Sequence, residues 1–208
     1  LNVLVQNAST VGLLDFKMLS QQDDNNFIFF DKLRSNKFKL LYLLGSDNLE
    51  FKKNNEFIVY QGSHGDRGAE LADVVLPSAA YTEQNGLYSN LEGRVQECKK
   101  ASYPIGDSLE DWKIFNLILK KLRKTNNLNN FDSLRKEAIN STKNFSQINE
   151  LPKKIFSKND KIISKFYSEE ILIRKLDYYF TNSISRSSKT MSECRQINKK
   201  TPKTGTIN

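Results

Sequence analysis

Three short apolar runs in the first half of the chain predict buried β-strands. They span residues 38–44, 56–60 and 72–76, and each run ends in small or polar residues. Their apolar character is continuous rather than alternating, which is typical of parallel strands covered by helices on both faces. The links between the runs are too short for a full helix in every case. The pattern therefore predicts an α/β fold with a partial doubly wound, mostly parallel sheet and irregular crossovers.

A hairpin and a helix are predicted after the sheet. Residues 87–91 and 94–98 flank a Glu92-Gly93 pair that favours a tight turn, so they predict a β-hairpin extension. Ser108 is predicted to cap the following helix, because its hydroxyl precedes an acidic first turn. The apolar stripe of that helix indicates packing in the core rather than a cofactor site. The stripe consists of Trp112, Phe115, Ile118, Leu119 and Leu122.

The second half of the chain is more polar and less regular. Residues 123–165 are rich in Lys, Asn and Ser, and a second apolar helical stretch at 162–179 precedes a Ser- and Arg-rich tail. We therefore expect an α/β domain at 1–124. A Lys/Asn-rich helical, partly irregular extension with a C-terminal tail is expected at 125–208.

Hydropathy and charge narrow the class of protein. Mean hydropathy is −0.57, and without a run of about 18 apolar residues we expect no direct membrane span. The first residues also lack the pattern of a targeting leader. The formal net charge of +8 raises the hypothesis of a basic nucleic-acid-binding protein. Lys outnumbers Arg about three to one, however, as an AT-rich coding sequence would produce, so no nucleic-acid partner is expected.

Few residues could hold a metal or a cluster. Cys98 and Cys194 lie far apart in the sequence, and an iron–sulfur cluster needs about four thiolates, so two inert thiols are expected. His64 is the one histidine, which excludes most zinc sites and His-dependent triads. In its Gly-rich loop at 62–68, a histidine bonded to backbone is the favoured interpretation over a general base or ligand. The glycine spacing of this loop differs from the phosphate-binding G-x-G-x-x-G pattern.

Two further groups of side chains have an alternative interpretation. Glu83, Glu92 and Arg94 could form an active-site trio, but Arg94 is predicted instead to pair with a carboxylate that fixes the hairpin. Tyr81 and Tyr88 are interpreted, like Trp112 in the helix stripe, as packing aromatics with a polar end near the surface.

The centre of the chain resembles one superfamily. Ala-Asp-Val-Val-Leu-Pro at 72–77 is followed by Glu83, by Asn…Glu-Gly-Arg ending at Arg94, and by Asp-Trp-Lys at 111–113. This order of residues resembles the molybdopterin-oxidoreductase-like superfamily. Within it, Tyr-Gln-Gly-Ser-His-Gly-Asp at 60–66 and the residues up to Glu83 look like the large iron–sulfur subunit of respiratory complex I (NADH:ubiquinone oxidoreductase).

Both ends of the chain agree with that subunit. Residues 7–15 are similar to its Ala-Ser-x-Val-Gly-x-Leu-Asp segment, and residues 180–194 look like its mitochondrial-type C-terminal tail. Residues 125–165 show no detailed likeness. Lys17 departs from the family, which usually has Gly there, so that turn is expected to be built differently.

The resemblance implies a structural fragment, the C-terminal part of that subunit encoded as a separate chain. No catalytic, cofactor-binding or metal-binding residue is expected on it, and the iron–sulfur clusters and FMN are expected on partner subunits. The implied partners are the cluster-bearing N-terminal half and other matrix-arm subunits, at the matrix side of the mitochondrial inner membrane. The chain would then support electron transfer from NADH to ubiquinone coupled to proton pumping. The alternative is a fragment of a molybdopterin-dependent oxidoreductase.

Overall fold

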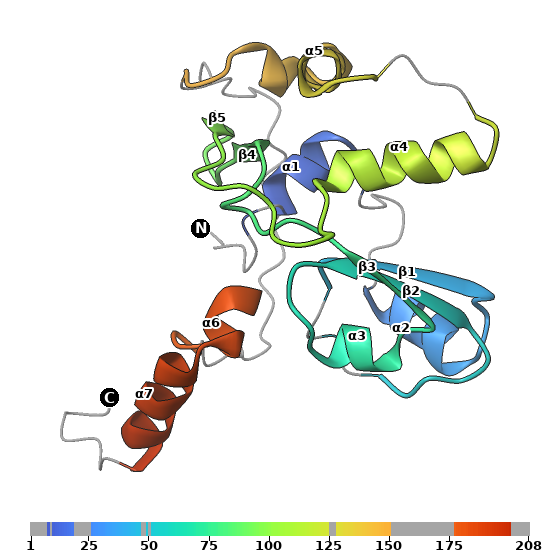
Figure 1. Cartoon of the computed structure of the whole chain (residues 1–208), viewed down its shortest axis with the longest axis vertical. Coiled ribbons are helices and arrows are strands. Elements are labelled where there is room, and N and C mark those ends of the chain that lie inside the picture. The colour runs from blue at the N-terminus through green and yellow to red at the C-terminus, as the bar shows by residue number, and fades with distance from the viewer. Residues whose placement is uncertain are drawn as a thin grey trace, which may run out of the picture. The chain divides into compact units, whose positions relative to one another are not determined.

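The computed structural model describes most of the chain, which falls into two compact units (Figure 1). The units span residues 1–153 and 154–208. The described residues are 8, 10–18, 26–46, 49, 51–124, 128–150 and 177–200. None of the helices among these residues is long and apolar enough to cross a membrane.

The predicted parallel sheet is present in the first unit. Strands β1 (Leu40–Leu44), β2 (Phe57–Gly62) and β3 (Val74–Pro77) are parallel neighbours in the order β1-β2-β3. Helix α2 (Asn26–Arg34) precedes the sheet, and the short helix α3 (Arg67–Leu71) connects β2 to β3. The described residues between β1 and β2 form no helix, in agreement with the short links read from the sequence.

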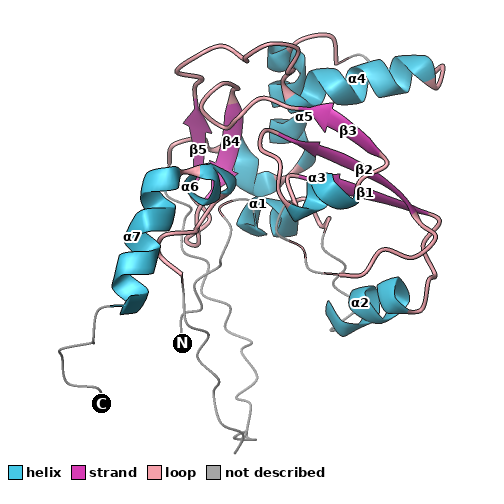
Figure 2. Cartoon of the chain, turned by 60° about the horizontal axis from the view of Figure 1, so that its bottom comes forward, coloured by secondary structure: helices cyan, strands magenta, loops and turns pink. Residues whose placement is uncertain are grey.

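Helices cover both faces of this sheet (Figure 2). On one face, Leu41 and Leu43 of β1 are buried with Leu33 of α2. On the other face, the ring of Tyr42 stacks on Phe115 of α4, a helix that spans Asp111–Lys121, with ring centroids 5.7 Å apart. The α/β class and the partial doubly wound sheet predicted from the sequence are therefore confirmed.

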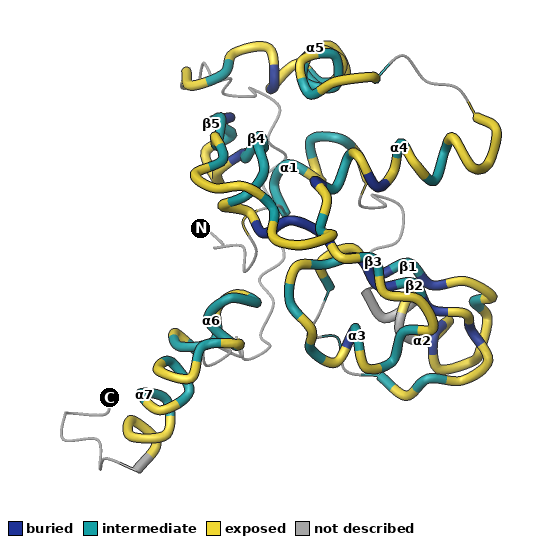
Figure 3. Tube along the Cα trace, in the orientation of Figure 1, coloured by how far each residue is buried: buried dark blue, intermediate teal, exposed yellow. Residues whose placement is uncertain are grey.

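The sheet is less completely buried than its continuous apolar runs predicted (Figure 3). In β1, Leu40 is 58% exposed and Leu44 is 51% exposed, and Phe57 at the start of β2 is 48% exposed. The register places Leu40 beside Phe57, and Val74 of β3 lies on the same face two residues further along. Helix α4 contacts Tyr42 on this face, yet Leu40, Phe57 and Val74 remain exposed, so apolar surface of the sheet is left open. We call Leu40, Phe57 and Val74 the open apolar patch.

The predicted hairpin follows the sheet. Strands β4 (Gly86–Ser89) and β5 (Val95–Cys98) pair antiparallel. The turn begins at Asn90, whose side-chain Oδ1 accepts hydrogen bonds from the backbone N–H groups of Glu92 and Arg94, at 3.0 and 2.9 Å. Gly93 adopts a φ of +80°, a conformation that favours glycine. The first strand is shorter than predicted because the Asn90 side chain starts the turn early.

Two segments remote in sequence pack beside the hairpin. Helix α1 spans Thr10–Asp15, and Ser89 Oγ donates to Asp15 Oδ2 at 3.2 Å. Lys17, two residues after this helix ends, adopts a φ of +54°, at the position where the resemblance indicates glycine. The buried ring of Phe145 lies 4.7 Å from that of Phe16, centroid to centroid, which ties the region after α4 to this cluster.

Residues 128–150 contain two short helices. Helix α5 (Phe131–Ser141) begins with a capping box, in which Asn130 Oδ1 accepts from the backbone N–H of Ser133 at 2.8 Å. The 3-10 helix η1 spans Lys143–Ser146. The boundary predicted after residue 124 stays a prediction.

The second unit contains two described helices. Helix α6 (Ser183–Ser187) begins at the cap Asn182, and helix α7 spans Lys189–Lys200. Arg195 of α7 bonds the carboxylate of Asp177 at 2.5 Å. The guanidinium carbon of Arg195 also lies 4.4 Å from the centroid of the Phe180 ring. The apolar stretch predicted at 162–179 lies, up to residue 176, outside the described residues.

Replacing Gly68 by Ala should destabilise the first unit. A Cβ at this position would lie 2.7 Å from the backbone oxygen of Ser46 and 3.0 Å from the ring of Tyr60, and a backbone oxygen cannot move aside cheaply. We expect a loss of about 1–3 kcal/mol in the free energy of unfolding, measured by thermal unfolding at low protein concentration. Gly65→Ala is the control, because its Cβ would meet nothing closer than Ala69 Cβ at 3.9 Å. Equal midpoints for the two variants would contradict the close approach at Gly68.

Candidate functional site

Polar side chains gather at the carboxyl ends of the parallel strands, where open α/β sheets bind their ligands. Gln61 is the penultimate residue of β2, and Ser78 directly follows β3. Both are buried, and the first residue of α4, Asp111, lies against them. This edge is therefore the first candidate for a functional site.

The carboxylate of Asp111 is the centre of this polar cluster. Its Oδ1 accepts hydrogen bonds from Gln61 Nε2 at 2.6 Å and from Ser78 Oγ at 2.7 Å. Its Oδ2 accepts from Gln84 Nε2 at 2.9 Å, and the backbone N–H of Asp111 donates back to Gln84 Oε1 at 3.1 Å. The hydroxyl of Tyr42 donates to Gln61 Oε1. Both oxygens of the Asp111 carboxylate are thus bonded by the chain itself.

Burial and the nearby carboxylate of Asp111 raise the pKa of Tyr42. The phenol therefore keeps its proton across the physiological pH range and stays a hydrogen-bond donor to Gln61. The cluster holds β1, β2, the end of β3 and α4 in one arrangement, which is a structural task.

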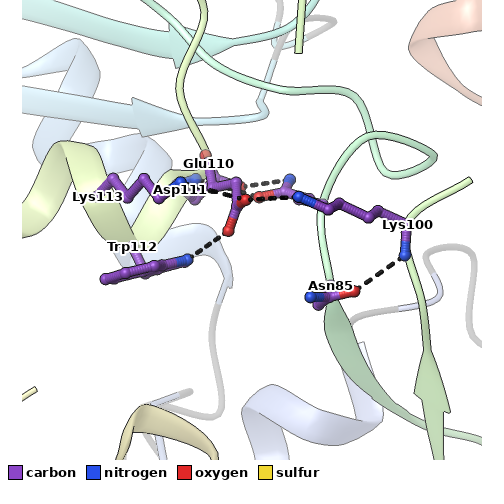
Figure 4. A network of polar contacts seen from close by, with 7 residues as sticks. Asn85, Lys100, Glu110, Asp111, Trp112 and Lys113 are labelled. Atoms are coloured by element: carbon purple, nitrogen blue, oxygen red, sulfur yellow. Dashed lines mark hydrogen bonds and ion pairs between the residues drawn. The ribbon is translucent and has the colours of Figure 1, made fainter. Parts of the chain in front are cut away.

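A second polar cluster surrounds Glu110, the residue before α4 (Figure 4). Its buried carboxylate accepts from Trp112 Nε1 at 2.6 Å, and the ammonium groups of Lys113 and Lys100 lie 3.4 and 3.6 Å from Oε1. Burial raises the pKa of Glu110. The hydrogen bond from Trp112 and the two nearby lysines together lower this pKa by more, so its net shift is downward. The backbone N–H of Lys100 donates to Asn85 Oδ1 at 3.0 Å, which ties the cluster to the hairpin.

The start of α4 differs from the prediction. Glu110 occupies the cap position without a side-chain capping bond, whereas Ser108 Oγ donates to the carbonyl of Ile105 at 2.7 Å. The predicted Ser108 cap is therefore wrong, because the helix begins later and the serine closes the preceding turn instead. The apolar stripe was also predicted too deep in the core. Ile114, which lies outside that stripe, is the buried residue of α4, while Phe115 and Leu122 are exposed.

The Gly-rich loop packs against its own chain. The hydroxyl of Tyr60 donates to the backbone oxygen of His64 at 2.6 Å, and Gly68 is buried against Ser46 and the Tyr60 ring. The His64 ring bonds Ser63 Oγ at 2.9 Å through Nδ1, rather than the backbone group predicted. The glycines thus allow close packing of the loop, and this contact supports the structural interpretation of the sequence.

The structure does not bring the proposed trio together. Glu83 Oε2 accepts from the backbone N–H of Ala80 at 3.0 Å, and Glu92 is exposed in the hairpin turn. Arg94 donates through Nη2 to the backbone oxygen of Asn149 at 3.1 Å. The prediction that Arg94 pairs with a carboxylate is therefore wrong, because its guanidinium reaches a backbone carbonyl of the region after α5. Tyr81, predicted as a packing aromatic, is 51% exposed.

Potential metal ligands are sparse in the described residues. Cys98 and Cys194 are free thiols of intermediate exposure and belong to different units. The part of the chain that the structure describes contains no group of three or more His, Cys, Asp or Glu residues placed to hold a metal ion.

An apolar groove of about 330 Å³ lies between the end of β3 and α4. Its lining includes Leu76, Pro77, Leu109, Ile114 and Leu117. Two of these side chains, Leu109 and Leu117, also count among the exposed large hydrophobic residues of the chain. The groove thus adds exposed apolar surface beside the polar clusters rather than a site with polar groups directed inward.

Comparison with known proteins assigns the family. The family model described as Molybdopterin oxidoreductase matches residues 1–121, and the model for the C-terminal region of the NADH-ubiquinone oxidoreductase G-subunit matches residues 141–194. The chain belongs to the molybdopterin oxidoreductase family. The second match begins within the stretch 125–165, so the lack of likeness predicted there holds for less of the chain than expected.

Curated relatives contain the same segment within longer chains. The chain is 36% identical over 201 residues to the NADH-ubiquinone oxidoreductase 75 kDa subunit of Reclinomonas americana. It is 38% identical over 200 residues to the NADH-quinone oxidoreductase G-subunit of Rickettsia felis, and 40% over 194 residues to that of Rickettsia typhi. These matches cover 93–96% of this chain but only 27–29% of each relative. The predicted resemblance to part of the large complex I subunit is confirmed.

Asp111→Ala should be strongly destabilising. The variant leaves the donors of the buried Gln61 and Ser78, and of the partly buried Gln84, without their acceptor, so we expect a loss of about 3 kcal/mol in unfolding free energy. Asp107→Ala is the matched control, because Asp107 is exposed four residues earlier and should change stability by about 0.5 kcal/mol or less. Thermal unfolding of both variants checks this. An Asp111→Ala midpoint close to that of the control would show that the cluster is not a stabilising contact.

Glu110→Gln should change how stability depends on pH. Because the folded-state pKa of Glu110 lies below its ordinary value of 4.5, the carboxylate stabilises the fold above that value, and this contribution is lost as the pH falls through the folded pKa. Near pH 7 the variant should be about 1 kcal/mol less stable. At about pH 3 the difference from the natural chain should shrink. Thermal midpoints at both pH values measure this, with exposed Glu92→Gln as control; a difference that does not depend on pH would contradict the ion pairs.

Proposed function

We propose that this chain is the C-terminal, structural part of the large iron–sulfur subunit of respiratory complex I. The observation that carries the proposal is the match over nearly all of this chain to 27–29% of relatives that are named as NADH-quinone or NADH-ubiquinone oxidoreductase subunits. As a subunit of NADH:ubiquinone reductase (H⁺-translocating), the chain would support electron transfer from NADH to ubiquinone coupled to proton pumping.

In this proposal the chain supplies no catalytic residue and no cofactor or metal ligand. The Asp111 cluster supports this. Both carboxylate oxygens of Asp111, at the carboxyl ends of the parallel strands, already accept hydrogen bonds from Gln61, Ser78 and Gln84. The two free thiols support it as well, since a cluster needs about four. Iron–sulfur clusters and FMN would then be carried by partner subunits.

The proposal also includes two domains of the chain and a location in the cell. Residues 1–124 would be the molybdopterin-oxidoreductase-like domain and 125–208 the extension, in line with family matches at 1–121 and 141–194. The likeness of residues 180–194 to a mitochondrial-type tail supports a location at the matrix side of the mitochondrial inner membrane. There the chain would contact the cluster-bearing N-terminal half and other subunits of the matrix arm.

A second candidate is a fragment of a molybdopterin-dependent oxidoreductase, which the description of the family matching residues 1–121 favours. The Gly-rich loop argues against it, because the space beside the buried Gly68 is filled by Ser46 and Tyr60 of the same chain rather than facing a ligand. Pterin fluorescence or molybdenum at one equivalent in the purified, partner-bound chain would favour this candidate over the structural role.

The exposed apolar residues of the first unit indicate a partner. The open apolar patch of Leu40, Phe57 and Val74 and the groove beside α4 both present apolar surface to solvent. A permanent contact over this surface should bury well above about 1,600 Å², mostly apolar. The cluster-bearing N-terminal half is the partner that the family relationship supports.

Co-expression with the cluster-bearing chain should rescue this chain from aggregation. Alone, its exposed apolar surface should drive self-association, while the pair should elute together in size-exclusion chromatography. Because the contact is predicted to be largely apolar, the pair should persist at high salt as well as at moderate salt. A well-behaved monomer with no affinity for the cluster-bearing chain would overturn the proposed function.

A further inference from the structure

A cavity of about 390 Å³ lies beside helix α5, and we call it the α5 cavity. Helix α5, the start of α4 and strand β4 with the two residues before it contribute to its wall, together with Phe16 and Phe145. None of the residues of α5, a helix that the structure describes in full, is buried. Its side chains in the cavity wall are spaced as one side of a helix: Phe131, Leu134, Arg135 and Ala138. This side of α5 therefore faces a cavity of the size that holds small molecules.

The wall of the α5 cavity is rich in aromatic rings. Phe16 and Phe145 contact each other at a centroid distance of 4.7 Å, and Phe131, Tyr88 and Trp112 contribute further rings. The N–H of Trp112 is already bonded to Glu110 (Figure 4), so this residue offers the cavity its ring rather than a donor. Aromatic walls favour a planar aromatic ligand, because ring pairs attract each other in offset and edge-to-face arrangements.

The polar side chains in the wall offer donors rather than acceptors. Within the described part of the chain, nothing accepts a hydrogen bond from Arg135 Nε, which is buried, or from the Tyr88 hydroxyl and the Asn85 amide nitrogen. The acceptors of the wall are already bonded. Asn85 Oδ1 accepts from the Lys100 N–H at 3.0 Å, and Gln84 Oε1 accepts from the Asp111 N–H at 3.1 Å. A ligand that satisfies this cavity must therefore supply acceptors of its own.

Arg135 gives the α5 cavity a positive charge. Glu97 Oε1 lies 3.7 Å from Arg135 Nε, close enough for an ion pair but too far for a hydrogen bond, so the guanidinium keeps its donors. The fork of an arginine matches a carboxylate, which can accept two parallel bonds from it.

The other groups near the cavity allow an anion to bind. The carboxylate of Asp111 also belongs to the wall, but its Oδ1 is bonded by Gln61 and Ser78 at the sheet, outside the cavity wall. Burial, followed by the charges of Cys98, Asp111 and Tyr81, raises the pKa of Tyr88. The Tyr88 hydroxyl therefore keeps its proton at neutral pH and can donate to the ligand.

We propose that the α5 cavity binds a small planar aromatic carboxylate, with its ring against the aromatic wall and its carboxylate on Arg135. Tyr88 and Asn85 would donate to the remaining oxygen lone pairs of the ligand. Such a ligand would join α5 to the hairpin and to the start of α4, and so stabilise the first unit. The inference concerns binding alone, and it does not depend on the proposed function.

Two probes of nearly the same shape test the site on the unmodified protein. trans-Cinnamate carries the carboxylate, whereas cinnamamide is its uncharged counterpart. In equilibrium dialysis against the full chain, one equivalent of cinnamate should bind about tenfold or more tightly than cinnamamide, because only the acid forms a charge-assisted pair with Arg135. Trp112 is the single tryptophan of the chain, so its fluorescence should change with the same dissociation constant.

Arg135 and its neighbour on α5 provide a matched pair of variants. Arg135→Gln should weaken cinnamate binding about tenfold, to the level of cinnamamide, and should leave cinnamamide binding unchanged. Lys136→Gln removes the same charge from an exposed position and should bind cinnamate as the natural chain does. Ala138→Phe should abolish binding of both probes, because the added ring fills the cavity. Thermal unfolding of the three variants checks that they are folded.

Three results would overturn the proposed site. The first is equal binding of the two probes, or of cinnamate by Arg135→Gln and Lys136→Gln. The second is the lack of saturable cinnamate binding to the natural chain at millimolar concentration. The third is binding to the isolated chain that disappears in the complex with the cluster-bearing chain, which would assign the cavity to a side chain of that partner. None of these results bears on the proposed function, which is tested by co-elution of the two chains.

Discussion

The half-buried carboxylate of Asp111 is the constraint on which the rest of the first unit depends. It joins a side chain of β2, the residue that follows β3 and the loop before the hairpin to the first turn of α4. A carboxylate is tolerated in this place because donors from three segments satisfy it. The same contacts fix α4 where Phe115 meets Tyr42, on a face of the sheet whose Leu40, Leu44 and Phe57 stay exposed.

Much of this fold could be predicted from residue patterns alone. Continuous apolar runs located β1, β2 and β3, and the Glu92-Gly93 pair located the hairpin, because these signals are local and their neighbours in space are close in sequence. Helix α4 was also found, but its first residue was not. Serine is a common N-cap residue, so Ser108 was a reasonable candidate. Its hydroxyl instead bonds the Ile105 carbonyl, in a turn that ends before the helix begins.

The polar clusters could not be predicted, because their partners are far apart in sequence. Gln61 and Asp111 are separated by 50 residues, and Arg94 and Asn149 by 55. The one available signal was a glutamine at the end of the apolar run before the Gly-rich loop, since a polar side chain in a buried strand requires a partner. Nothing in local composition indicated that Asp111 would be this partner. Likewise, which side chains of a continuous apolar run stay exposed depends on how far the helices of the folded chain reach across the sheet.

The edge position of β1 in the sheet has a consequence for how much of this protein a cell can keep. An exposed edge strand with apolar side chains is a template for any other extended chain, including further copies of itself. In the proposed assembly, chain that has not yet assembled would therefore be open to aggregation and proteolysis, while the assembled form would be protected. Its steady-state abundance would then follow that of the subunits that cover this surface in the proposed assembly, even where they are synthesised at unequal rates. The ratio of their amounts would then be set by degradation of the unassembled chains rather than by equal rates of translation.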